Sequence, residues 1–593
     1  MYQLEWLKQM GFGGVEIAWV YPQPDSRRGP EFLSEGWSKK VAYAKACCDR
    51  LGLGCDFTFG TLWPFGGSFV PEEDASRVYS GLSRQRLRST WEDPFLEEPA
   101  HILNHLSRNA LERYAGKMAD GLSDALAGSR SGLFCDSWEI ETEGLWTDGF
   151  GDAFRDAYGY RIEDYIESID EHPDVRYDYR KLIGRYVLEE FYKPFAEICR
   201  ELGAFSRVQC HGSPTDLLAA YGCVDVPETE AILFEPYFAR IASSAAALTG
   251  KPVVSCETFT CLYGWTPRPG PAPHQRRELV ADMKLLFDSI VANGVNHIVW
   301  HGMPYNPPGG RNEFYATVHV GPQAGFVDEI RPFNAYMESV CSTMRRGSTC
   351  SGIAVYLPVE DAWMAGRLPP GEYPPDAKHH WEFRYLRMPE ELRGYHPLWI
   401  SGGYLMGAEF ENGFLRVGDA KFRALYLDVD WLDEDVLDDL LRLAHEGLPI
   451  CLKRRPRQPG REKTGSFEAK LAELMSLPSV TAGLGSIPCG PPIVSGDPMP
   501  EYWCRADGDR HFIFFANPLS REATYPMRYG QSLSTDTVTV PVRISLSDKC
   551  VVTVDLVFEP YQSILMEIEP DGKVRRHDIT FAPRPPPAGS QDL

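Results

Sequence analysis

Two glutamates follow apolar segments that have the length of buried strands, at positions suited to a pair of catalytic carboxyl groups. Glu139 comes shortly after the apolar run at 132–135, and Glu257 comes directly after the run at 251–256. Parallel-stranded barrels build their active sites at the carboxyl ends of the strands. Two carboxyl groups there can cleave a glycosidic bond, one by protonating the leaving oxygen and one by acting on the anomeric carbon or its water. A single acid at a strand end is more often simply solvated, so it is the pairing that favours chemistry.

Glu139 is followed by two further acids, Glu141 and Glu143. If the strand before them continued through this run, all three carboxylates would point to one side of the sheet. Because neighbouring carboxylates raise a pKa, this crowding favours Glu139 as the proton donor of the pair and Glu257 as its partner.

Histidines and aromatic residues occur at comparable strand ends. His211 and His301 each end an apolar run and are each followed by glycine, which lets a backbone or ligand approach closely. We expect both to donate hydrogen bonds to sugar hydroxyls, although a lone histidine is more often a core residue. Aromatic rings can stack on the apolar face of a pyranose, and the candidates are Trp63, Trp138 and Tyr305. As core residues these rings would need no ligand.

Two further acidic features are candidates for binding. Glu16 lies inside the apolar run 14–20, where an unpaired charge is costly, so we expect it to face the site and bind substrate, with a structural salt bridge equally favoured. The acidic run 225–230 contains Glu228 and Glu230, and hard oxygen ligands in a loop suit calcium. A solvated loop is the equal alternative. No HxH or HExxH spacing supports zinc.

The elements that would position these residues alternate as short apolar runs and amphipathic helices over the first 345 residues. The runs at 14–20, 54–59, 133–138, 206–210, 232–235, 253–256 and 296–300 predict seven parallel strands. A helix at 2–10 precedes the first of them. The pattern therefore predicts a (β/α)8 TIM-like barrel over 1–345 whose first strand is apparently missing.

Two smaller units are predicted after the barrel. Residues 346–487 resume the strand and helix alternation, typical of a flavodoxin- or amidotransferase-like α/β domain, without a glycine-rich phosphate loop. Residues 488–572 contain alternating strands separated by turn residues, which favours a β-sandwich. The segment 573–593, with its proline-rich end, is predicted to be disordered.

Composition limits the partners. Lys plus Arg total 60 against 83 Asp plus Glu, a net charge of -23 that repels nucleic acid and anionic lipid and suits a neutral substrate. No apolar run is long enough to span a bilayer, and the oligomeric state is not determined by the sequence. Fifteen cysteines without a CxxC pair indicate buried free thiols, and no signal peptide is visible, so we expect a cytoplasmic protein, or a secreted or periplasmic one if the N-terminus is truncated.

Eight short motifs occur in an order that resembles the glycoside hydrolase family 106 α-L-rhamnosidases over about residues 1–365. They are GGVEI at 13–17, WPFGG at 63–67, DSWE at 136–139, YGY at 158–160, QCHG at 209–212, YG at 221–222 with DVPETE at 225–230, GKP at 250–252 with SCETF at 255–259, and VWHG at 299–302 with Tyr305.

The resemblance implies an inverting, exo-acting hydrolase that releases terminal α-L-rhamnose from a glycan or glycoside, with a calcium ion at the sugar. Carried over position by position, Glu139 and Glu257 are the catalytic pair and Glu228 is the expected calcium ligand, with Glu230 in the same acidic run. Two alternatives stay open. One is a retaining β-glycosidase with the same strand placement, and the other is a catalytically silent carbohydrate-binding homologue.

Overall fold

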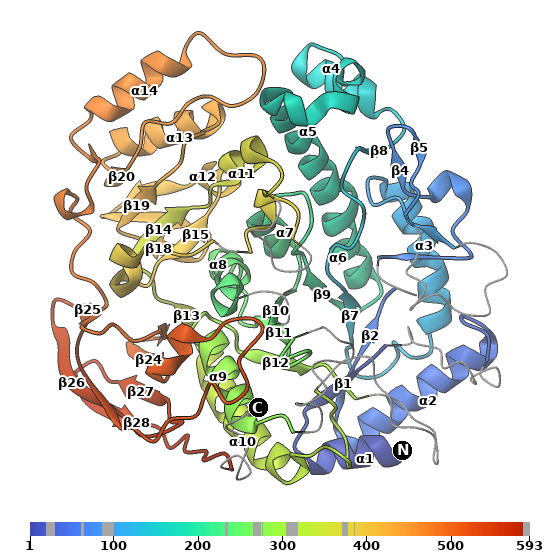
Figure 1. Ribbon diagram of the computed structural model, residues 1–593, viewed down its shortest axis with the longest axis vertical. Coiled ribbons are helices and arrows are strands. Elements are labelled where there is room, and N and C mark those ends of the chain that lie inside the picture. The colour runs from blue at the N-terminus through green and yellow to red at the C-terminus, as the bar shows by residue number, and fades with distance from the viewer. Residues whose placement is uncertain are drawn as a thin grey trace.

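The fold was analysed in a computed structural model of the 593-residue chain (Figure 1). The structure describes residues 1–18, 30–60, 64–85, 100–231, 235–264, 274, 277–303, 318–369, 377–384 and 386–584. Within them, no helix is both long and apolar enough to cross a membrane. All fifteen cysteines are free thiols, as the sequence predicts, and most are buried.

A curled sheet of seven parallel strands forms the centre of the described N-terminal region. The strands follow one another along the sheet in chain order: β1 (Gly14–Ile17), β2 (Gly54–Thr58), β7 (Gly132–Cys135), β9 (Phe205–Gln209), β10 (Val226–Ala231), β11 (Ser255–Thr258) and β12 (His297–Trp300). Each connection between parallel neighbours needs a crossover, and helices supply most of them. The helices are α1 (Tyr2–Gln9), α2 (Glu35–Leu51), α3 (Arg108–Leu122), α4 (Phe150–Tyr158), α5 (Pro173–Tyr186), α6 (Lys193–Glu201), α7 (Leu217–Cys223), α8 (Arg240–Leu248), α9 (Val280–Val291) and α10 (Val327–Met344).

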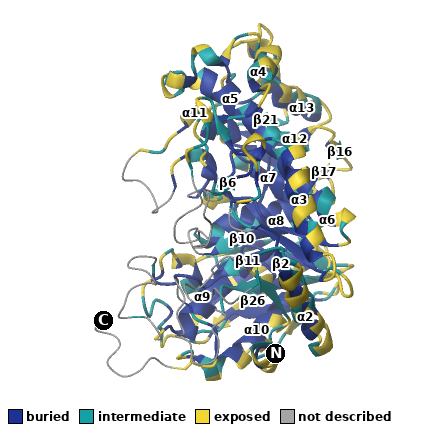
Figure 2. Cartoon of the chain, turned by 90° about the vertical axis from the view of Figure 1, so that its right-hand side faces the viewer, coloured by how far each residue is buried: buried dark blue, intermediate teal, exposed yellow. Residues whose placement is uncertain are grey.

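Helix α2 shows how the local sequence sets such a crossover. The Ser34 side chain accepts a hydrogen bond from the Trp37 backbone amide, which caps the first turn, and Gly52 ends the helix at φ 63°. The buried residues between these caps lie on one face, while the solvent side is exposed (Figure 2). An amphipathic helix of this kind covers the outer face of the curled sheet. The inner face of the sheet is then available for polar side chains.

Helix α9 differs because it is buried along its whole length. The C-terminal part of the chain covers the side that would otherwise face solvent. Ser563 donates to Asp288 at 2.6 Å, and Ser532 donates to Asp282 at 2.6 Å. The C-terminal domain is therefore attached to the barrel through buried polar contacts.

A second parallel sheet lies beyond α10, in the yellow and orange region of Figure 1. Its strand order is β15 (Leu398–Ile400), β14 (Ile353–Tyr356), β19 (Ala424–Leu427), β20 (Ile450–Leu452) and β21 (Val480–Thr481), with helices α13 (Glu434–His445) and α14 (Phe467–Ser476). A small antiparallel sheet of β16 (Glu409–Glu411), β17 (Phe414–Val417) and β18 (Ala420–Phe422) accompanies it. The alternation of strands and helices predicted over 346–487 is present in this region.

The C-terminal strands form two antiparallel sheets with a shared core. One contains β13 (Ser348–Thr349), β23 (Tyr502–Asp507), β24 (Arg510–Phe515), β27 (Ile564–Ile568) and β28 (Val574–Arg576), and the other contains β22 (Val494–Gly496), β25 (Val538–Ser547) and β26 (Cys550–Phe558). Inward residues of both sheets, such as Ile513 and Leu556, belong to one buried cluster. Two antiparallel sheets are therefore present in the region where the sequence predicts a β-sandwich. Strand β13 comes from the segment after α10, which the sequence pattern did not reveal.

Two predicted segments differ from the structure. The strand expected at 232–235 instead runs over Val226–Ala231 as β10, so the acidic run 225–230 is a strand and not a loop; residues 232–234 lie outside the described ranges. The tail predicted to be disordered over 573–593 contains β28, and its Phe581 ring packs 5.4 Å from that of Phe333. Residues 585–593 of this tail lie outside the described ranges. Buried apolar residues after β28 explain this order.

Candidate active site

Strands β9, β10 and β11 place polar side chains in two layers inside the curve of the sheet. Gln209 is opposite Glu228, which is opposite Ser255 on the next strand. Two residues further along, Glu230 is opposite Glu257. Because alternate residues of a strand face the same side, both layers point inward and the second is nearer the carboxyl ends.

The first layer is organised around Arg207, a buried arginine of β9. Its guanidinium bonds Glu228 and Glu16, and its Nε lies 3.4 Å from Asp56 Oδ2. The cation also lies 4.4 Å from the centre of the Phe134 ring. Burial alone would disfavour the charged form, but the three carboxylates outweigh it and raise the pKa of Arg207. Four strands are thus joined by one charge cluster.

The second layer surrounds Glu257. Gln209 Nε2 donates to Glu257 Oε2 at 2.8 Å, and His301 Nδ1 lies 3.5 Å from Glu257 Oε1. His211 Nε2 lies 2.7 Å from Glu230 Oε2. Burial, then the charges of nearby acids including Glu230, raise the pKa of Glu257 well above its usual range. Burial also lowers the pKa of His301 to about 4, so the imidazole is neutral near pH 7.

Asp136 joins the two predicted catalytic glutamates electrostatically. Burial, then the charge of Glu139 and, more weakly, that of Glu230, raise the pKa of Asp136 well above its usual range. Asp136 in turn raises the pKa of Glu257. The structure therefore brings Glu139 and Glu257 to one acidic cluster. Asp136 is not among the predicted site residues, although it directly follows the apolar run 132–135.

The three acids after β7 do not point to one side as expected. Strand β7 ends at Cys135, so residues beyond it do not alternate in the predicted way. Glu143 is exposed and forms an ion pair with Arg367 of the second domain, and Glu141 is also exposed. The crowding that favoured Glu139 as the proton donor is therefore not supplied by these two neighbours. The acid that interacts with Glu139 electrostatically is Asp136, whose pKa is raised by burial and then by the charge of Glu139.

The predicted sugar-binding residues have different surroundings. His211 and His301 lie beside acidic side chains of the site. Glu16 forms a salt bridge with Arg207, which is the structural role predicted as the alternative to substrate binding. Trp138 is buried against His105 and Phe191 and fills the core. The other two aromatic candidates, Trp63 and Tyr305, lie outside the described residues. Sugar binding by these side chains stays a prediction.

The glycine after His211 behaves as predicted. Gly212 has φ 79°, and a Cβ there would lie 2.8 Å from the Trp138 carbonyl oxygen. The Trp138 amide donates to the His211 carbonyl at 3.0 Å. The missing side chain lets the loop after β7 approach the end of β9 closely, and this loop leads to Glu139.

The contacts of Glu228 do not fit a calcium ligand. Its Oε1 accepts from Gln209 at 3.1 Å, and its Oε2 accepts from Ser255 at 2.6 Å and from Arg207. Each oxygen already has a donor, one of them cationic. Glu230 accepts from His211 on one oxygen. In the parts of the chain that the structure describes, no three His, Cys, Asp or Glu side chains form a metal-holding group. Calcium binding stays a prediction.

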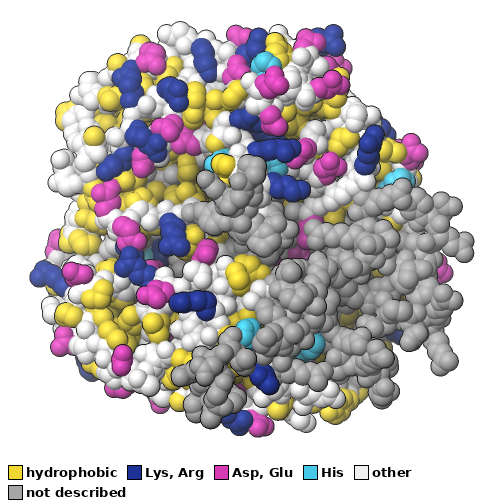
Figure 3. All heavy atoms as spheres, viewed as in Figure 1, with side chains coloured by type: hydrophobic (Ala, Val, Ile, Leu, Met, Phe, Trp, Pro, Cys, Tyr) yellow, Lys and Arg dark blue, Asp and Glu magenta, His cyan; other side chains and the backbone are white. Residues whose placement is uncertain are grey.

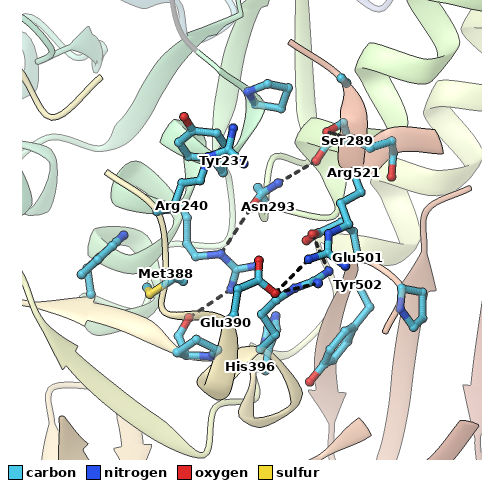
Figure 4. Close-up of a pocket in the computed structure, with 18 residues that line it drawn as sticks. Tyr237, Arg240, Ser289, Asn293, Met388, Glu390, His396, Glu501, Tyr502 and Arg521 are labelled. Atoms are coloured by element: carbon cyan, nitrogen blue, oxygen red, sulfur yellow. Dashed lines mark hydrogen bonds and ion pairs between the residues drawn. The ribbon is translucent and has the colours of Figure 1, made fainter. Parts of the chain in front are cut away.

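A separate pocket lies where the barrel meets both accessory domains (Figure 4). Arg240 of α8 reaches its centre and donates to Asn293 Oδ1 at 3.3 Å and to the Pro397 carbonyl at 3.0 Å. Arg393 bonds Glu501 at 2.6 Å across the domain junction. None of the predicted catalytic residues lines this pocket. Its polar groups bond one another across elements of three domains, which is the pattern of a structural junction.

A curled parallel sheet with acidic side chains gathered at the carboxyl ends of its strands is the architecture of a barrel-type glycosidase. The sequence profile of glycoside hydrolase family 106, described as alpha-L-rhamnosidase, matches residues 100–480. The chain belongs to this family of glycoside hydrolases.

Individual relatives are more distant. A protein of Formosa agariphila named "Putative beta-glucuronidase" is 25% identical over 373 residues, which cover 60% of this chain and 29% of that protein. The chain therefore spans well under half the length of this relative. Among solved structures, a rhamnosidase from Novosphingobium sp. PP1Y has a TM-score of 0.69 at 13% identity, covering 95% of this chain and 80% of that one. A β-galactosidase from Rahnella sp. R3 has a TM-score of 0.55 at 12% identity, covering 95% of each chain. At these identities the structural likeness concerns the fold.

Proposed function

We propose that this chain is an exo-acting, inverting α-L-rhamnosidase that releases terminal rhamnose from a glycan or glycoside. The observation that carries the proposal is the acidic cluster of Asp136, Glu139, Glu230 and Glu257 at the carboxyl ends of β7, β10 and β11. Membership of family 106 and the fold likeness to a rhamnosidase support the choice of sugar.

In the proposed reaction, Glu139 donates its proton to the glycosidic oxygen as the bond from that oxygen to the anomeric carbon breaks. Glu257 takes a proton from a water molecule whose oxygen forms the new bond on the opposite face of the sugar. A base must be ionised, and the hydrogen bond that the Gln209 amide donates to Glu257 favours the carboxylate form, against the burial and nearby acids that raise the pKa of Glu257. In the proposal, the neutral His301 beside Glu257 hydrogen-bonds the water or a sugar hydroxyl.

The test is a panel of aryl glycosides given to the full chain: the α-L-rhamnoside, the β-glucuronide and the β-galactoside. We expect release of the aryl group from the rhamnoside alone, with β-L-rhamnose as the first anomer seen by proton NMR. Hydrolysis of a β-glycoside but not the rhamnoside would contradict the proposed sugar, and first release of the α-anomer would contradict inversion. A silent homologue would turn over nothing yet bind rhamnose in calorimetry. A rhamnoside that carries a further sugar on its ring tests the exo mode, because it should resist cleavage.

A further inference from the structure

We propose that Gln209 is a positioning residue that holds the Glu257 carboxylate, and that Glu228 and Arg207 beneath it keep Gln209 in place. This inference rests on the proposed function, because it assigns a role to residues around its catalytic base. It also gives Glu228 a role other than calcium ligand.

The contacts of Gln209 carry the first step. Its Nε2 donates to Glu257 Oε2 at 2.8 Å and to Glu228 Oε1 at 3.1 Å, and the side chain is completely buried. A side-chain amide has two N–H donors on this nitrogen, so each carboxylate receives one. The reverse amide orientation would turn an oxygen toward two carboxylates, which repels them if both are ionised. The two acids therefore determine the orientation of the amide.

Glu228 is itself held in place by neighbouring residues of the first layer. Its Oε2 accepts from Ser255 at 2.6 Å and from the Arg207 guanidinium, and Arg207 also bonds Glu16 on β1. A buried carboxylate that is bonded to an arginine and a hydroxyl has little freedom to move. The chain of contacts from Arg207 through Glu228 and Gln209 thus connects the rigid lower layer to Glu257.

The Gln209 bond matters because the other groups facing Glu257 act against its ionised form. Asp136 on the β7 side and Glu228 and Glu230 on β10 are acidic, and His301 after β12 is neutral near pH 7. The Gln209 amide on β9 favours the carboxylate and partly offsets burial. Without it, Glu257 would be held less firmly and would bind its proton more tightly.

The test compares Gln209→Met with Ser206→Ala in the full chain. Methionine keeps the length of the side chain but has no donor. Ser206 lies on the opposite face of the same strand, where it bonds Asp225, so its loss controls for general damage to β9. On an aryl rhamnoside we expect Gln209→Met to lower kcat about tenfold to a hundredfold with KM within about twofold, and Ser206→Ala to leave both near wild type.

The pH profile adds a readout that a merely structural residue would not move. In Gln209→Met the acidic limb of kcat/KM should shift upward by about one pH unit, because a hydrogen bond to a charged group is lost. A wild-type kcat and an unshifted limb would overturn the proposal. Glu228→Gln should also lower kcat, and calcium in excess should not restore it; full restoration by calcium would show that Glu228 is a metal ligand instead.

A stability measurement separates this proposal from the proposed function. If the wild type hydrolyses no glycoside of the panel, the proposed function fails, yet the contact is still testable by urea unfolding across pH 4.5 to 8. Gln209→Met should lose more stability at high pH, where Glu257 is ionised, than at low pH. In a Glu257→Gln background that dependence should vanish. A loss that is the same at every pH in both backgrounds would overturn the positioning role.

Discussion

Two buried arginines, Arg207 and Arg240, show how differently the same side chain is used in two parts of the molecule. Arg207 sits in the barrel and faces carboxylates of Glu16, Asp56 and Glu228, which raise its pKa. Arg240 sits at the domain junction and donates to neutral oxygens, including the Ala292 carbonyl at the end of α9. Burial lowers the pKa of Arg240 to about 10.

This difference distinguishes the candidate active site from the structural junction between domains. Three carboxylates surround the single positive charge of Arg207. Further acidic side chains, Glu257 and Asp136, lie in the second layer, and their raised pKa values suit groups that exchange protons. Around Arg240 the guanidinium donates to the Asn293 side-chain oxygen and to the backbone carbonyls of Pro397 and Ala292, which stabilises the junction between elements. On the described part of the face shown in Figure 3, basic and acidic side chains are interspersed.

The largest effect is expected from removing the catalytic acids. Glu257→Gln should lower kcat by about a thousandfold or more on every rhamnoside, because no base remains to activate water. Glu139→Gln should lose as much on a natural glycoside but far less on an aryl rhamnoside with a good leaving group, which needs little protonation.

The matched control for these variants is Glu501→Gln in the junction pocket, which should leave kcat within about twofold on both substrates. Reversal of the pattern would exchange the two roles. Near wild-type rates for both glutamate variants would show that the chemistry lies elsewhere.

A smaller effect is expected on stability when each arginine is replaced. Arg207→Met leaves several carboxylates without their buried cation and should cost about 3 to 5 kcal/mol. Arg240→Met leaves neutral carbonyls short of one donor and should cost about 1 to 3 kcal/mol. Urea unfolding near pH 7 measures both free energies. Equal losses would remove the distinction between a charge-compensated site and a neutral junction.

The smallest expected effect is a pH dependence that belongs to the acidic cluster. The pKa of Glu257 is raised in the fold, so from its unfolded value upward the folded state binds more protons than the unfolded state, and stability falls as pH rises. The glutamine side chain in Glu257→Gln cannot ionise, so this variant should not lose the part of the folding stability that ionisation of Glu257 removes as pH rises. Its thermal midpoint relative to wild type should therefore rise from pH 4.5 toward pH 8, whereas that of Arg240→Met should stay level. A flat difference for Glu257→Gln would contradict the raised pKa.

Local pattern was enough to predict most of the architecture. Apolar runs of strand length separated by amphipathic helices indicate parallel strands wherever they occur, because burial on both faces requires that pattern. The strands near residues 14, 54, 133, 206, 253 and 296, the second α/β sheet and the C-terminal strands were all read in this way. The pairing of Glu139 with Glu257 followed from the same reading, since both stand after such runs.

The sequence by itself therefore determined which residues end the strands and so which acids belong to one edge of the sheet. Only the tertiary structure decided what those acids contact. The run 225–230 was predicted to be an acidic loop that either binds calcium or is solvated. In the structure Arg207 compensates the charge of Glu228 and His211 bonds Glu230, and most of the run lies in the largely buried strand β10. Such compensation comes from residues about twenty positions away, which local periodicity does not reveal. For the same reason Gln209, an ordinary polar residue in sequence, acquires its position between two carboxylates only when three strands come together.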